Sequence, residues 1–402
     1  MNKLTTGRPL VVRGSFEPPS PFYIGYHFYH HHHHLTQGLQ KMWIFQILWL
    51  LGAVLVISAT LFSWIPFKKW WLRIWDFPRL QVLVCGVVLL LFSVLFGFNG
   101  AQDRTLWLVI WVLLIISLVR QSMWIVRMTP LFKSEVPSEY IPTQRSIKLI
   151  ASNVDYTNEF RSQAIDSLVK NDPDILALIE VDHQWKDLIQ SYIDRYPHQV
   201  LELKNNGKGM ALLSKIPIVE SEIRYIVSED RPSIWIQVRF PNHLHDQSDQ
   251  SDQSDQSDQG NDPDLVGICV LHPPPPGLMK QNKNERVSSK PRDIELVIAS
   301  EFVADSEIKH WVMFGDFNDV GWSRTTEQAK LIGNLFDPRI GKGFYSTYHA
   351  RWPLLRYPID HVFVSGSFRV PTLACLDDIG SDHLPLLAEL QLDQTIENPG
   401  HL

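Results

Sequence analysis

Cysteine is scarce in this sequence. The 402 residues contain only Cys85, Cys269 and Cys375, with no Cys-x-x-Cys spacing. This excludes a disulfide-stapled scaffold and a cysteine-rich zinc site, and predicts buried free thiols. A cleavable signal peptide is not expected either, because the first long apolar run begins near Met42 and exceeds the apolar core of such a peptide. We therefore expect a chain that is retained in a membrane rather than released.

Charge is missing from three stretches near the amino terminus. Residues 42–65 have no charged residue over 24 positions, residues 81–98 none over 18, and residues 105–119 none over 15. About 20 apolar residues cross a hydrocarbon core as a helix. We predict three transmembrane helices within 42–126, the third reaching residue 126 if Arg120 extends toward an interface. Tryptophans gather at the ends of these segments, as amphipathic rings do at membrane interfaces: Trp64, Trp70, Trp71, Trp75, Trp107 and Trp124. The alternative is buried helices of a soluble bundle.

Basic residues are unevenly distributed between the predicted loops. The second loop has only Arg104, beside Asp103, whereas more basic residues lie in the first loop and after the third helix: Lys68, Lys69, Arg73, Arg79, Arg127 and Lys133. Cytoplasmic loops are enriched in Lys and Arg, so this bias predicts a cytoplasmic carboxyl-terminal domain. Four basic residues in the tail dilute it: Lys3, Arg8, Arg13 and Lys41.

Composition divides the remaining chain. We predict a disordered, histidine-rich tail at residues 1–41, whose run at 26–34 could bind transition metals, a linker at 127–146, a folded domain at 147–393 and a tail at 394–402. Residues 244–262 are predicted as a low-complexity loop insertion, because Asp, Gln and Ser repeat at residues 246–259 without an apolar residue. Residues 145–402 contain 25 Lys and Arg against 38 Asp and Glu, so the folded part is acidic.

From residue 147 onward, short apolar strands alternate with amphipathic helices. Helices are predicted at 160–169, 182–193 and 292–304. Strands are predicted at 147–151, 175–179, 209–213, 218–226, 233–240, 265–271, 311–314, 359–364, 370–374 and 384–390. These are more strands than one sheet comfortably holds. The pattern therefore predicts an α/β fold of two packed, mixed β-sheets flanked by helices, preceded by the transmembrane helical region.

Acids, amides and histidines repeatedly follow these strands. They comprise the carboxylates Asp155, Glu180, Asp316, Asp360 and Asp382, the amides Asn153 and Asn318, and the imidazoles His272 and His383. Strand ends gathered at one edge would form a rigid polar cleft. Its oxygen-rich donors suit Mg²⁺ or Mn²⁺, whereas Zn²⁺ would call for more His or Cys. Such an ion favours reaction at phosphorus.

Each motif alone has a structural explanation. The Gly315-Asp316-Phe317-Asn318-Asp319 segment could close a strand and cap a helix, and Ser381-Asp382-His383 could be an N-cap. His272 could mark a strand that ends against Pro273–Pro276. Only the ordered combination of the motifs indicates a catalytic site.

The order of these polar motifs along the chain resembles that of the endonuclease/exonuclease/phosphatase superfamily, which has the DNase I-like fold. With the apolar segments before it, the chain resembles a membrane-anchored, bacterial-type member. The resemblance covers residues 147–393 and implies a four-layer α/β sandwich with its active site at the strand ends. It implies that Glu180 is the principal metal ligand, with Asn153 contacting the ion or the phosphate and Asp382 completing the metal side. It also implies that Asp316 orients or deprotonates the attacking water, while Asn318 holds the phosphate.

For the histidines, the resemblance implies that His383, oriented by Asp360, contacts the scissile phosphate. His272 would lie near the leaving group, and Asp155 matches an acidic position of only some branches. The loops that select a substrate have unfamiliar composition here. Four residues in them could line the cleft or serve packing: Trp322, Arg324, Trp352 and Arg356.

Three functions follow from these expectations. The first is a membrane-tethered, Mg²⁺- or Mn²⁺-dependent hydrolase of a phosphate ester, such as a lipid headgroup or inositol phosphate. The second is a nuclease acting on DNA or RNA, which the acidic domain disfavours because nucleic-acid affinity rests on Lys and Arg. The third is an inactive membrane scaffold, which the intact set of catalytic residue types disfavours.

Overall fold

The computed structural model describes residues 44–65, 69–96, 104–241, 262–275, 290–393 and 395. The predicted histidine run, the Asp-Gln-Ser repeat and nearly all of the predicted tail 394–402 lie outside the described residues. The chain divides into two compact units, residues 1–55 and 56–402.

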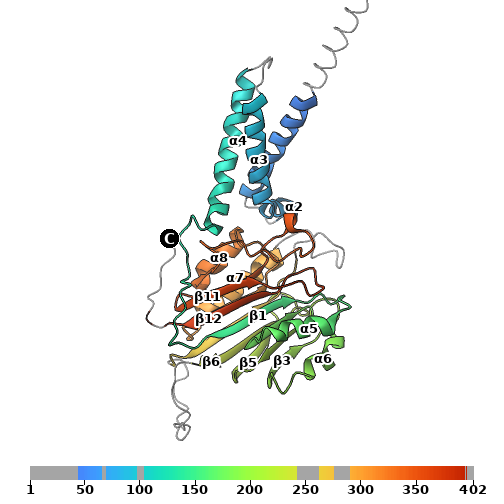
Figure 1. Ribbon diagram of the computed structural model, residues 1–402, viewed down its shortest axis with the longest axis vertical. Helices are drawn as coiled ribbons and strands as arrows, with labels where there is room; N and C mark the ends of the chain where they lie inside the picture. Colours follow the sequence, from blue (N-terminus) through green and yellow to red (C-terminus); the bar gives the residue numbers. More distant parts are fainter. Residues whose placement is uncertain are drawn as a thin grey trace, which may run out of the picture. The chain divides into compact units, whose positions relative to one another are not determined.

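The three apolar segments form helices (Figure 1). The first runs from Ile44 to Trp64. The others are α3 (Arg79–Phe96) and α4 (Arg104–Ile125), with short helical pieces at α2 (Trp70–Arg73), η1 (Ile74–Asp76) and η2 (Val126–Met128). Ile44–Trp64 and Arg104–Met128 are long and apolar enough to cross a membrane, whereas the apolar helix Arg79–Val94 is shorter. By length and composition, the described residues therefore give two candidate spans, and three spans remain a prediction.

The third segment is longer than its charge-free run because Arg120 is accommodated inside α4. The Arg120 guanidinium lies 5.9 Å from the Trp64 ring and 5.3 Å from the Trp124 ring. Cation–π contact of this kind lets a charged group remain on an apolar helix. The helix therefore continues past Arg120 to Ile125.

A close helix approach and a polar cluster join these segments. A Cβ on Gly86 of α3 would lie 2.5 Å from Leu118 Cδ2 of α4, so a larger residue would have to displace the Leu118 side chain. Arg79 Nη1 donates to Gln121 Oε1 at 3.2 Å, and Gln121 Nε2 donates to Thr60 Oγ1 at 3.0 Å. Residues from all three helices thus contact one another.

The remaining chain forms two six-stranded sheets. The first has the order β11-β12-β1-β2-β4-β3, with β1 Ile147–Asn153, β2 Ile175–Ile179, β3 His198–Glu202, β4 Met210–Ser214, β11 Phe368–Cys375 and β12 Leu386–Leu392. The second has the order β5-β6-β7-β8-β10-β9, with β5 Ile218–Arg224, β6 Ser233–Arg239, β7 Leu265–Leu271, β8 His310–Asp316, β9 Leu335–Phe336 and β10 Asp360–Ser365. Both sheets mix parallel and antiparallel pairs.

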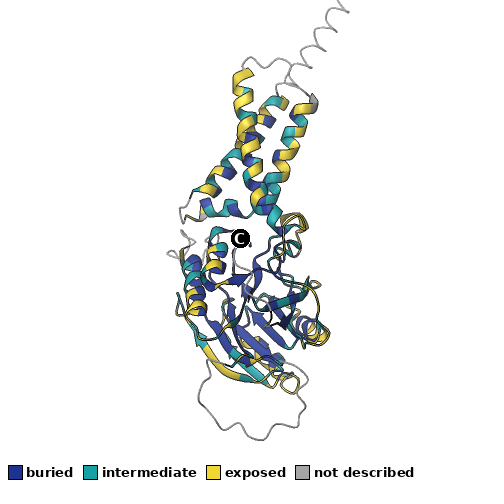
Figure 2. Ribbon diagram, turned by 90° about the vertical axis from the view of Figure 1, so that its left-hand side faces the viewer, coloured by how far each residue is buried: buried dark blue, intermediate teal, exposed yellow. Residues whose placement is uncertain are grey.

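Helices cover the outer face of each sheet. The first sheet is covered by α5 (Arg161–Lys170), η3 (His183–Trp185) and α6 (Lys186–Gln190), and the second by α7 (Lys290–Ala304) and α8 (Arg324–Gly333). Alternate strand residues point to opposite faces, so Leu149 joins the core between the sheets while Ile150 packs under the helices. Figure 2 shows the buried strands inside this arrangement. The predicted two-sheet α/β sandwich is confirmed.

All ten predicted strands are present. The elements of the folded domain that were not predicted include the edge strand β3, the two-residue β9 and helix α8. In β3, His198–Glu202, every residue is only half-buried, so the strand has no continuous apolar run. The helix predicted at 182–193 is shorter, because the chain enters it through the 3-10 turn His183–Trp185.

Residues 127–146, predicted as a linker, pack against the sheets. Val136 is buried in the core between them, and Val370 N donates to Pro137 O at 2.9 Å. Ile141 N donates to Gln391 Oε1 at 2.8 Å. This segment attaches to the folded domain rather than spacing it from the helices.

Candidate active site

Strand register brings the polar strand ends together. In the first sheet Asn153 pairs with Ile179, which places it beside Glu180. In the second sheet Leu271 pairs with Gly315, so His272 and Asp316 end neighbouring parallel strands. Asp316 also pairs directly with Asp360 of β10. Parallel neighbours end at the same sheet edge, which explains why these residues meet.

Asn153 links the carboxylates of the two sheets. Its Nδ2 donates to Glu180 Oε1 at 3.0 Å and to Asp316 Oδ2 at 3.1 Å. Its backbone carbonyl accepts a hydrogen bond from Ser381 Oγ at 2.7 Å, and Ser381 Oγ in turn accepts from His383 N at 3.0 Å. One buried amide therefore holds two carboxylates close together, and Ser381 attaches the late loop to the same strand end.

The backbone at these ends adopts conformations that few residues tolerate. Glu180 has φ 68° and Asn318 has φ 52°, in the left-handed region. Gly315 has φ 132°, and a Cβ there would lie 2.3 Å from Leu271 O. Such strain persists only where the surrounding structure enforces it, which is common at functional sites. The glycine before Asp316 is thus required by the close approach of β7 to β8.

His383 is hydrogen-bonded to Asp360. The His383 Nδ1 to Asp360 Oδ2 distance is 2.8 Å, and His383 Nε2 faces Asp316 Oδ2 at 3.6 Å. Thr347 Oγ1 donates to the same Asp360 oxygen. Burial alone would lower the pKa of His383, but the charges of Asp360 and Asp316 raise it to about 10. His383 is therefore a cation at neutral pH, with its Nε2 side turned to the site.

His272 occupies the opposite side of the carboxylates. Its Nε2 lies 3.7 Å from Glu180 Oε1 and 3.9 Å from Asp316 Oδ2. Burial holds the pKa of His272 well below its usual value, and the charges of Arg231 and His383 lower it further. This imidazole is neutral at pH 7 and can donate one hydrogen bond.

The donor set fits a hard divalent cation. Burial raises the pKa of Glu180 to about 7 and that of Asp316 to about 6. These pKa shifts show carboxylates whose charge is poorly solvated, which a cation would compensate. Glu180 and Asp382 offer carboxylate oxygens of the kind that Mg²⁺ and Mn²⁺ prefer.

A second group of three residues has side chains of the types that bind metals, but we assign it a different role. Ligand atoms of Asp316, Asp360 and His383 lie within 4.8 Å of one another. Asp360 Oδ2, however, already accepts hydrogen bonds from both His383 and Thr347. Because Asp360 Oδ2 holds the His383 ring in place, we describe the pair as a carboxylate-oriented histidine, although Asp360 Oδ1 has no hydrogen-bond partner among the described residues.

The other predicted residues have distinct environments. Asn318 Nδ2 donates to Pro273 O at 2.9 Å, which joins the Asp316 turn to the segment after His272. The Asp382 backbone carbonyl accepts from Ala350 N at 2.7 Å. Asp155 Oδ1 accepts from Thr157 N at 2.9 Å and from Thr157 Oγ1 at 2.7 Å. The Asp155 carboxylate therefore closes its own turn, which is a structural role.

A family model agrees with this geometry. The model described as "Endonuclease/Exonuclease/phosphatase family" matches residues 150–383, from the first strand to His383. The chain belongs to this family. Members of the endonuclease/exonuclease/phosphatase family are nucleases and phosphatases, so their common chemistry is hydrolysis of phosphate ester bonds.

Solved structures of this fold are similar along the whole domain. An endonuclease/exonuclease/phosphatase from Bacteroides vulgatus is 16% identical, with TM-score 0.45, and the match covers 62% of this chain and 100% of that one. D. rerio TDP2 complexed with a single-strand DNA product is 14% identical, with TM-score 0.46, covering 61% and 98%. ANGEL2, a 2',3'-cyclic phosphatase, is 15% identical, with TM-score 0.44, covering 63% and 98%. No curated protein matches. At these scores the structures say nothing about the substrate.

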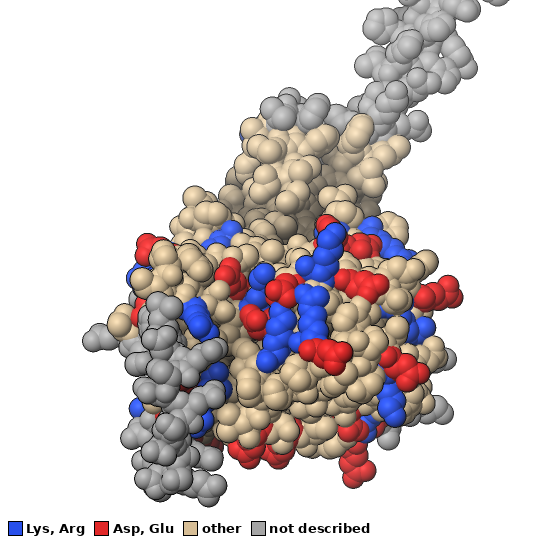
Figure 3. All heavy atoms as spheres, turned by 60° about the horizontal axis from the view of Figure 1, so that its bottom comes forward, with Lys and Arg blue, Asp and Glu red and all other residues tan. Residues whose placement is uncertain are grey.

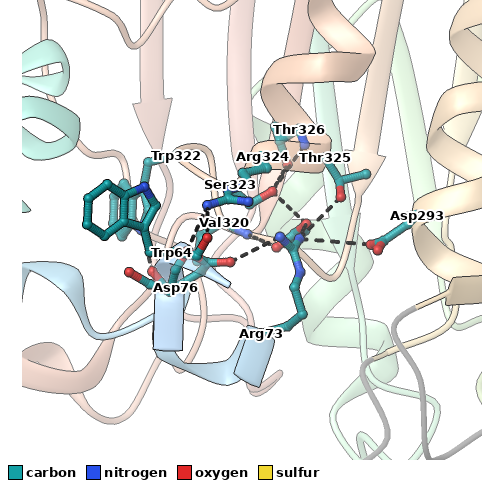
Figure 4. Close-up of polar contacts among 12 residues, drawn as sticks. Trp64, Arg73, Asp76, Asp293, Val320, Trp322, Ser323, Arg324, Thr325 and Thr326 are labelled. Atoms are coloured by element: carbon teal, nitrogen blue, oxygen red, sulfur yellow. Dashed lines mark hydrogen bonds and ion pairs between the residues drawn. The ribbon is translucent and has the colours of Figure 1, made fainter. Parts of the chain in front are cut away.

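In this family member, an ion network supports the turn that carries Asp316 (Figure 4). Asp319 ends the turn that carries Asp316 and Asn318. Its Oδ2 lies 3.2 Å from Arg73 Nη2 and 3.2 Å from Arg292 Nη2. Arg292 Nη1 donates to Asn318 O at 2.8 Å. The turn is therefore held by α7 and by α2, an element that lies before α3.

Further contacts fix α2 in this position. Arg73 Nη2 donates to Thr325 Oγ1 at 3.2 Å, and Arg73 Nη1 lies 3.1 Å from Asp76 Oδ2. Trp322 Nε1 donates to Asp76 O at 2.7 Å. Figure 4 shows Thr325 and Asp293 facing Arg73, with Trp322 beside Asp76. The short helix between two apolar helices thus packs against the folded domain.

The four loop residues that could line the cleft or serve packing fall into two pairs. Trp322 is buried, and Arg324 Nη2 donates to Trp64 O at 2.5 Å, so both serve packing. Trp352 is 62% exposed, and Arg356 donates to the carbonyls of His349 and Ala350. These last two therefore flank a surface loop.

Sequence reasoning missed Thr347, Arg73 and Asp319. Thr347 is a lone threonine in an irregular segment and gave no signal. Arg73 was counted only as a loop charge. A carboxylate directly after the Asp316-Phe317-Asn318 stretch was visible, but only the structure shows that it faces away from the site, toward Arg73.

Proposed function

We propose that this chain is a membrane-tethered, divalent-metal-dependent hydrolase of a phosphate ester. The supporting observation is that a protonated His383, oriented by Asp360, faces Asp316 across from Glu180 and His272. The positively charged imidazole of His383 and the negatively charged carboxylates of Glu180 and Asp316 lie within one buried cluster. This combination of charges suits a phosphate bound between them.

The residues divide the reaction as follows. Asp316 as a carboxylate accepts a proton from water as that water attacks phosphorus. His383 donates a hydrogen bond to the phosphate and offsets its charge. The ester P–O bond breaks, and the leaving oxygen takes a proton from solvent while the neutral His272 donates a hydrogen bond to it. A Mg²⁺ or Mn²⁺ ion held by Glu180 and Asp382, with Asn153 beside it, would neutralise further phosphate charge.

The contacts made by the start of α3 and by the segment directly after α4 support three membrane spans. The start of α3 contacts the domain, because Gln81 Nε2 donates to Leu354 O at 2.8 Å. The end of α4 also contacts it, because Arg127 lies 3.0 Å from Glu327. If α4 crosses a membrane, α3 must cross it too, since both begin or end at one domain. We therefore keep three spans as part of the proposal.

The side of the membrane was predicted from basic residues that include Arg73 and Arg79. Arg79 is buried, the Arg73 side chain is 10% exposed, and both pair with Asp76. Basic residues that are paired with acids inside the protein predict the side of the membrane less well than unpaired basic residues do. A cytoplasmic domain therefore rests mainly on the few basic residues left, among them Lys69, which is exposed.

A nuclease activity is the alternative that the same site could support. On the face that Figure 3 shows, the described Lys and Arg side chains stand among Asp and Glu side chains rather than forming a track of one sign. Duplex binding relies on such basic tracks. Figure 3 views the bottom of Figure 1, whereas α2, which contacts the turn that carries Asp316, lies at the top of the folded domain. The acidic composition of residues 145–402, with 25 Lys and Arg against 38 Asp and Glu, therefore favours small or lipid-borne phosphate esters over nucleic acid.

A substrate panel tests the proposal. The full-length protein would be assayed with Mg²⁺ and Mn²⁺ on a soluble phosphodiester, inositol phosphates, and single- and double-stranded DNA and RNA. We expect hydrolysis of the soluble ester, lost in His383→Ala and kept in His310→Ala, a matched histidine at the other end of β8. Equal activity in both variants would contradict the assigned site, and preferential cleavage of nucleic acid would favour the nuclease.

A further inference from the structure

One exposed loop of the domain carries apolar side chains between two arginines. Residues 351–356 read Arg-Trp-Pro-Leu-Leu-Arg, and we name them the interfacial loop. Trp352 is 62% exposed, Leu354 87% and Leu355 53%. Three neighbouring large apolar residues at a loop tip are unusual on a soluble surface. Trp and Arg around an apolar tip are typical of segments at a membrane interface.

The loop is attached to the start of an apolar helix. Gln81, in the first turn of α3, donates from Nε2 to Leu354 O at 2.8 Å. Just before that turn, the Phe77 ring contacts the Tyr357 ring at 5.6 Å, edge to face. Beyond it, α3 exposes apolar side chains along its length: Val84, Val87, Val88, Leu91 and Val94. The loop therefore lies at the level where the apolar helix begins, which is the interface if α3 enters a bilayer.

The same loop is connected to the catalytic histidine. Tyr348 forms backbone bridges with Tyr357 on one side and with His383 on the other. The Tyr348 ring lies 4.9 Å from the His383 ring. Ala350 N donates to Asp382 O at 2.7 Å. Only Arg351 lies between Ala350 and the exposed Trp352, so the apolar tip and the phosphate-binding side of the site form one assembly.

We propose that the interfacial loop inserts into the bilayer surface, and that the substrate is a phosphate ester carried by a membrane lipid. This inference rests on the proposed hydrolase activity. Arg351 is exposed and Arg356 half-buried beside the tip, and both suit lipid phosphates. Continuity of the loop with α3 identifies the bilayer as its occupant, because any span formed by α3 brings the tip to that surface.

The test compares lipids with their headgroups alone. Full-length protein in nanodiscs or vesicles would be given phosphatidic acid, phosphatidylglycerol or phosphatidylinositol phosphate. The soluble arms are glycerol phosphate, glycerophosphoglycerol, inositol phosphate and bis(p-nitrophenyl) phosphate. We expect Leu354→Asp to lower hydrolysis of the vesicle lipid by about tenfold or more, because an ionised side chain resists insertion. Hydrolysis of bis(p-nitrophenyl) phosphate should stay within about twofold, because the side chain is remote from the reacting atoms.

Two controls separate insertion from a structural effect. Leu354→Phe keeps an apolar tip and should retain hydrolysis of the lipid. Val219→Asp places the same charge on β5, at the sheet edge opposite β9 and β10, and should change neither activity. Val219 is also exposed, at 43%.

The outcomes distinguish the two proposals. If Leu354→Asp lowers lipid and soluble hydrolysis equally, or lowers neither, insertion of the loop is refuted. If the wild type cleaves the soluble headgroups as fast as the lipids, a free phosphate ester is the substrate and the lipid inference fails while the hydrolase stands. If it cleaves nothing, bis(p-nitrophenyl) phosphate included, the proposed function itself fails.

Discussion

Replacing Arg73 by alanine should slow catalysis although Arg73 lies outside the active site. Its guanidinium contacts Asp319 at 3.2 Å, and the side chain is 10% exposed. Leaving a buried charge without any partner costs about 3–5 kcal/mol. Asp319 would still keep Arg292 at 3.2 Å and Ser323 Oγ at 2.6 Å. We therefore expect a loss of about 2 kcal/mol, below that range.

The loss should appear in turnover. If all of it served to hold Asp316 and Asn318 in place, kcat would fall by about 30-fold, since each 1.4 kcal/mol is tenfold. KM for a soluble phosphodiester should change little, because Arg73 does not reach the site. Arg73→Lys should recover part of the rate. Lys69→Ala, an exposed residue of the same loop, should have no effect.

A double-mutant cycle decides whether Arg73 acts through Asp319. If it does, Arg73→Ala combined with Asp319→Asn should be little worse than Asp319→Asn alone. Losses that add, or a rise in KM with kcat unchanged, would refute the positioning role. The same reasoning predicts that a fragment beginning at residue 145 is impaired, because it lacks Arg73 and uncovers the apolar residues Val320, Trp322 and Ile340.

Three further changes test other groups. Glu180→Gln should raise the Mg²⁺ concentration for half-maximal activity by about tenfold or more, and an unchanged metal titration would contradict its role as ligand. Asp360→Asn should lower kcat by about a hundredfold, because an amide cannot favour protonated His383; a normal rate would show that the pair is only structural. Burial raises the pKa of Glu295 from 4.5 to about 7. The folded chain therefore binds a proton that the unfolded chain releases, and about 3 kcal/mol of stability present below pH 4.5 is lost as pH rises through 7. Glu295→Gln should reduce the fall in Tm between about pH 5 and about pH 8; a fall as large as in the wild type would contradict this.

The strands and the main site residues could be predicted because their signals are local. Continuous apolar runs such as residues 175–179 and 265–271 give strands that are buried on both faces. Polar residues directly after such runs must lie at the ends of strands. The register between neighbouring strands then determines which of these ends lie side by side. This reasoning correctly predicted that Asn153, Glu180, His272 and Asp316 lie together, while their roles stay predictions.

What could not be predicted depends on contacts between distant segments. Arg73 and Asp319 are 246 residues apart, and no local pattern shows that a loop charge is buried against a catalytic turn. The half-buried β3 lacks an apolar run, and Thr347 gains its role only because the chain returns to Asp360. Similarly, Asp155 looks like a ligand in sequence, whereas its carboxylate is satisfied by its own turn.

The central claim is metal-dependent hydrolysis at the Glu180 and Asp316 site. The most direct measurement is hydrolysis of bis(p-nitrophenyl) phosphate by the full-length protein with Mn²⁺, after EDTA, and after Mn²⁺ is restored. We predict that EDTA abolishes activity, that Mn²⁺ restores it, and that Asp316→Asn lowers kcat by about a thousandfold. Activity that survives both EDTA and Asp316→Asn would contradict the proposed mechanism.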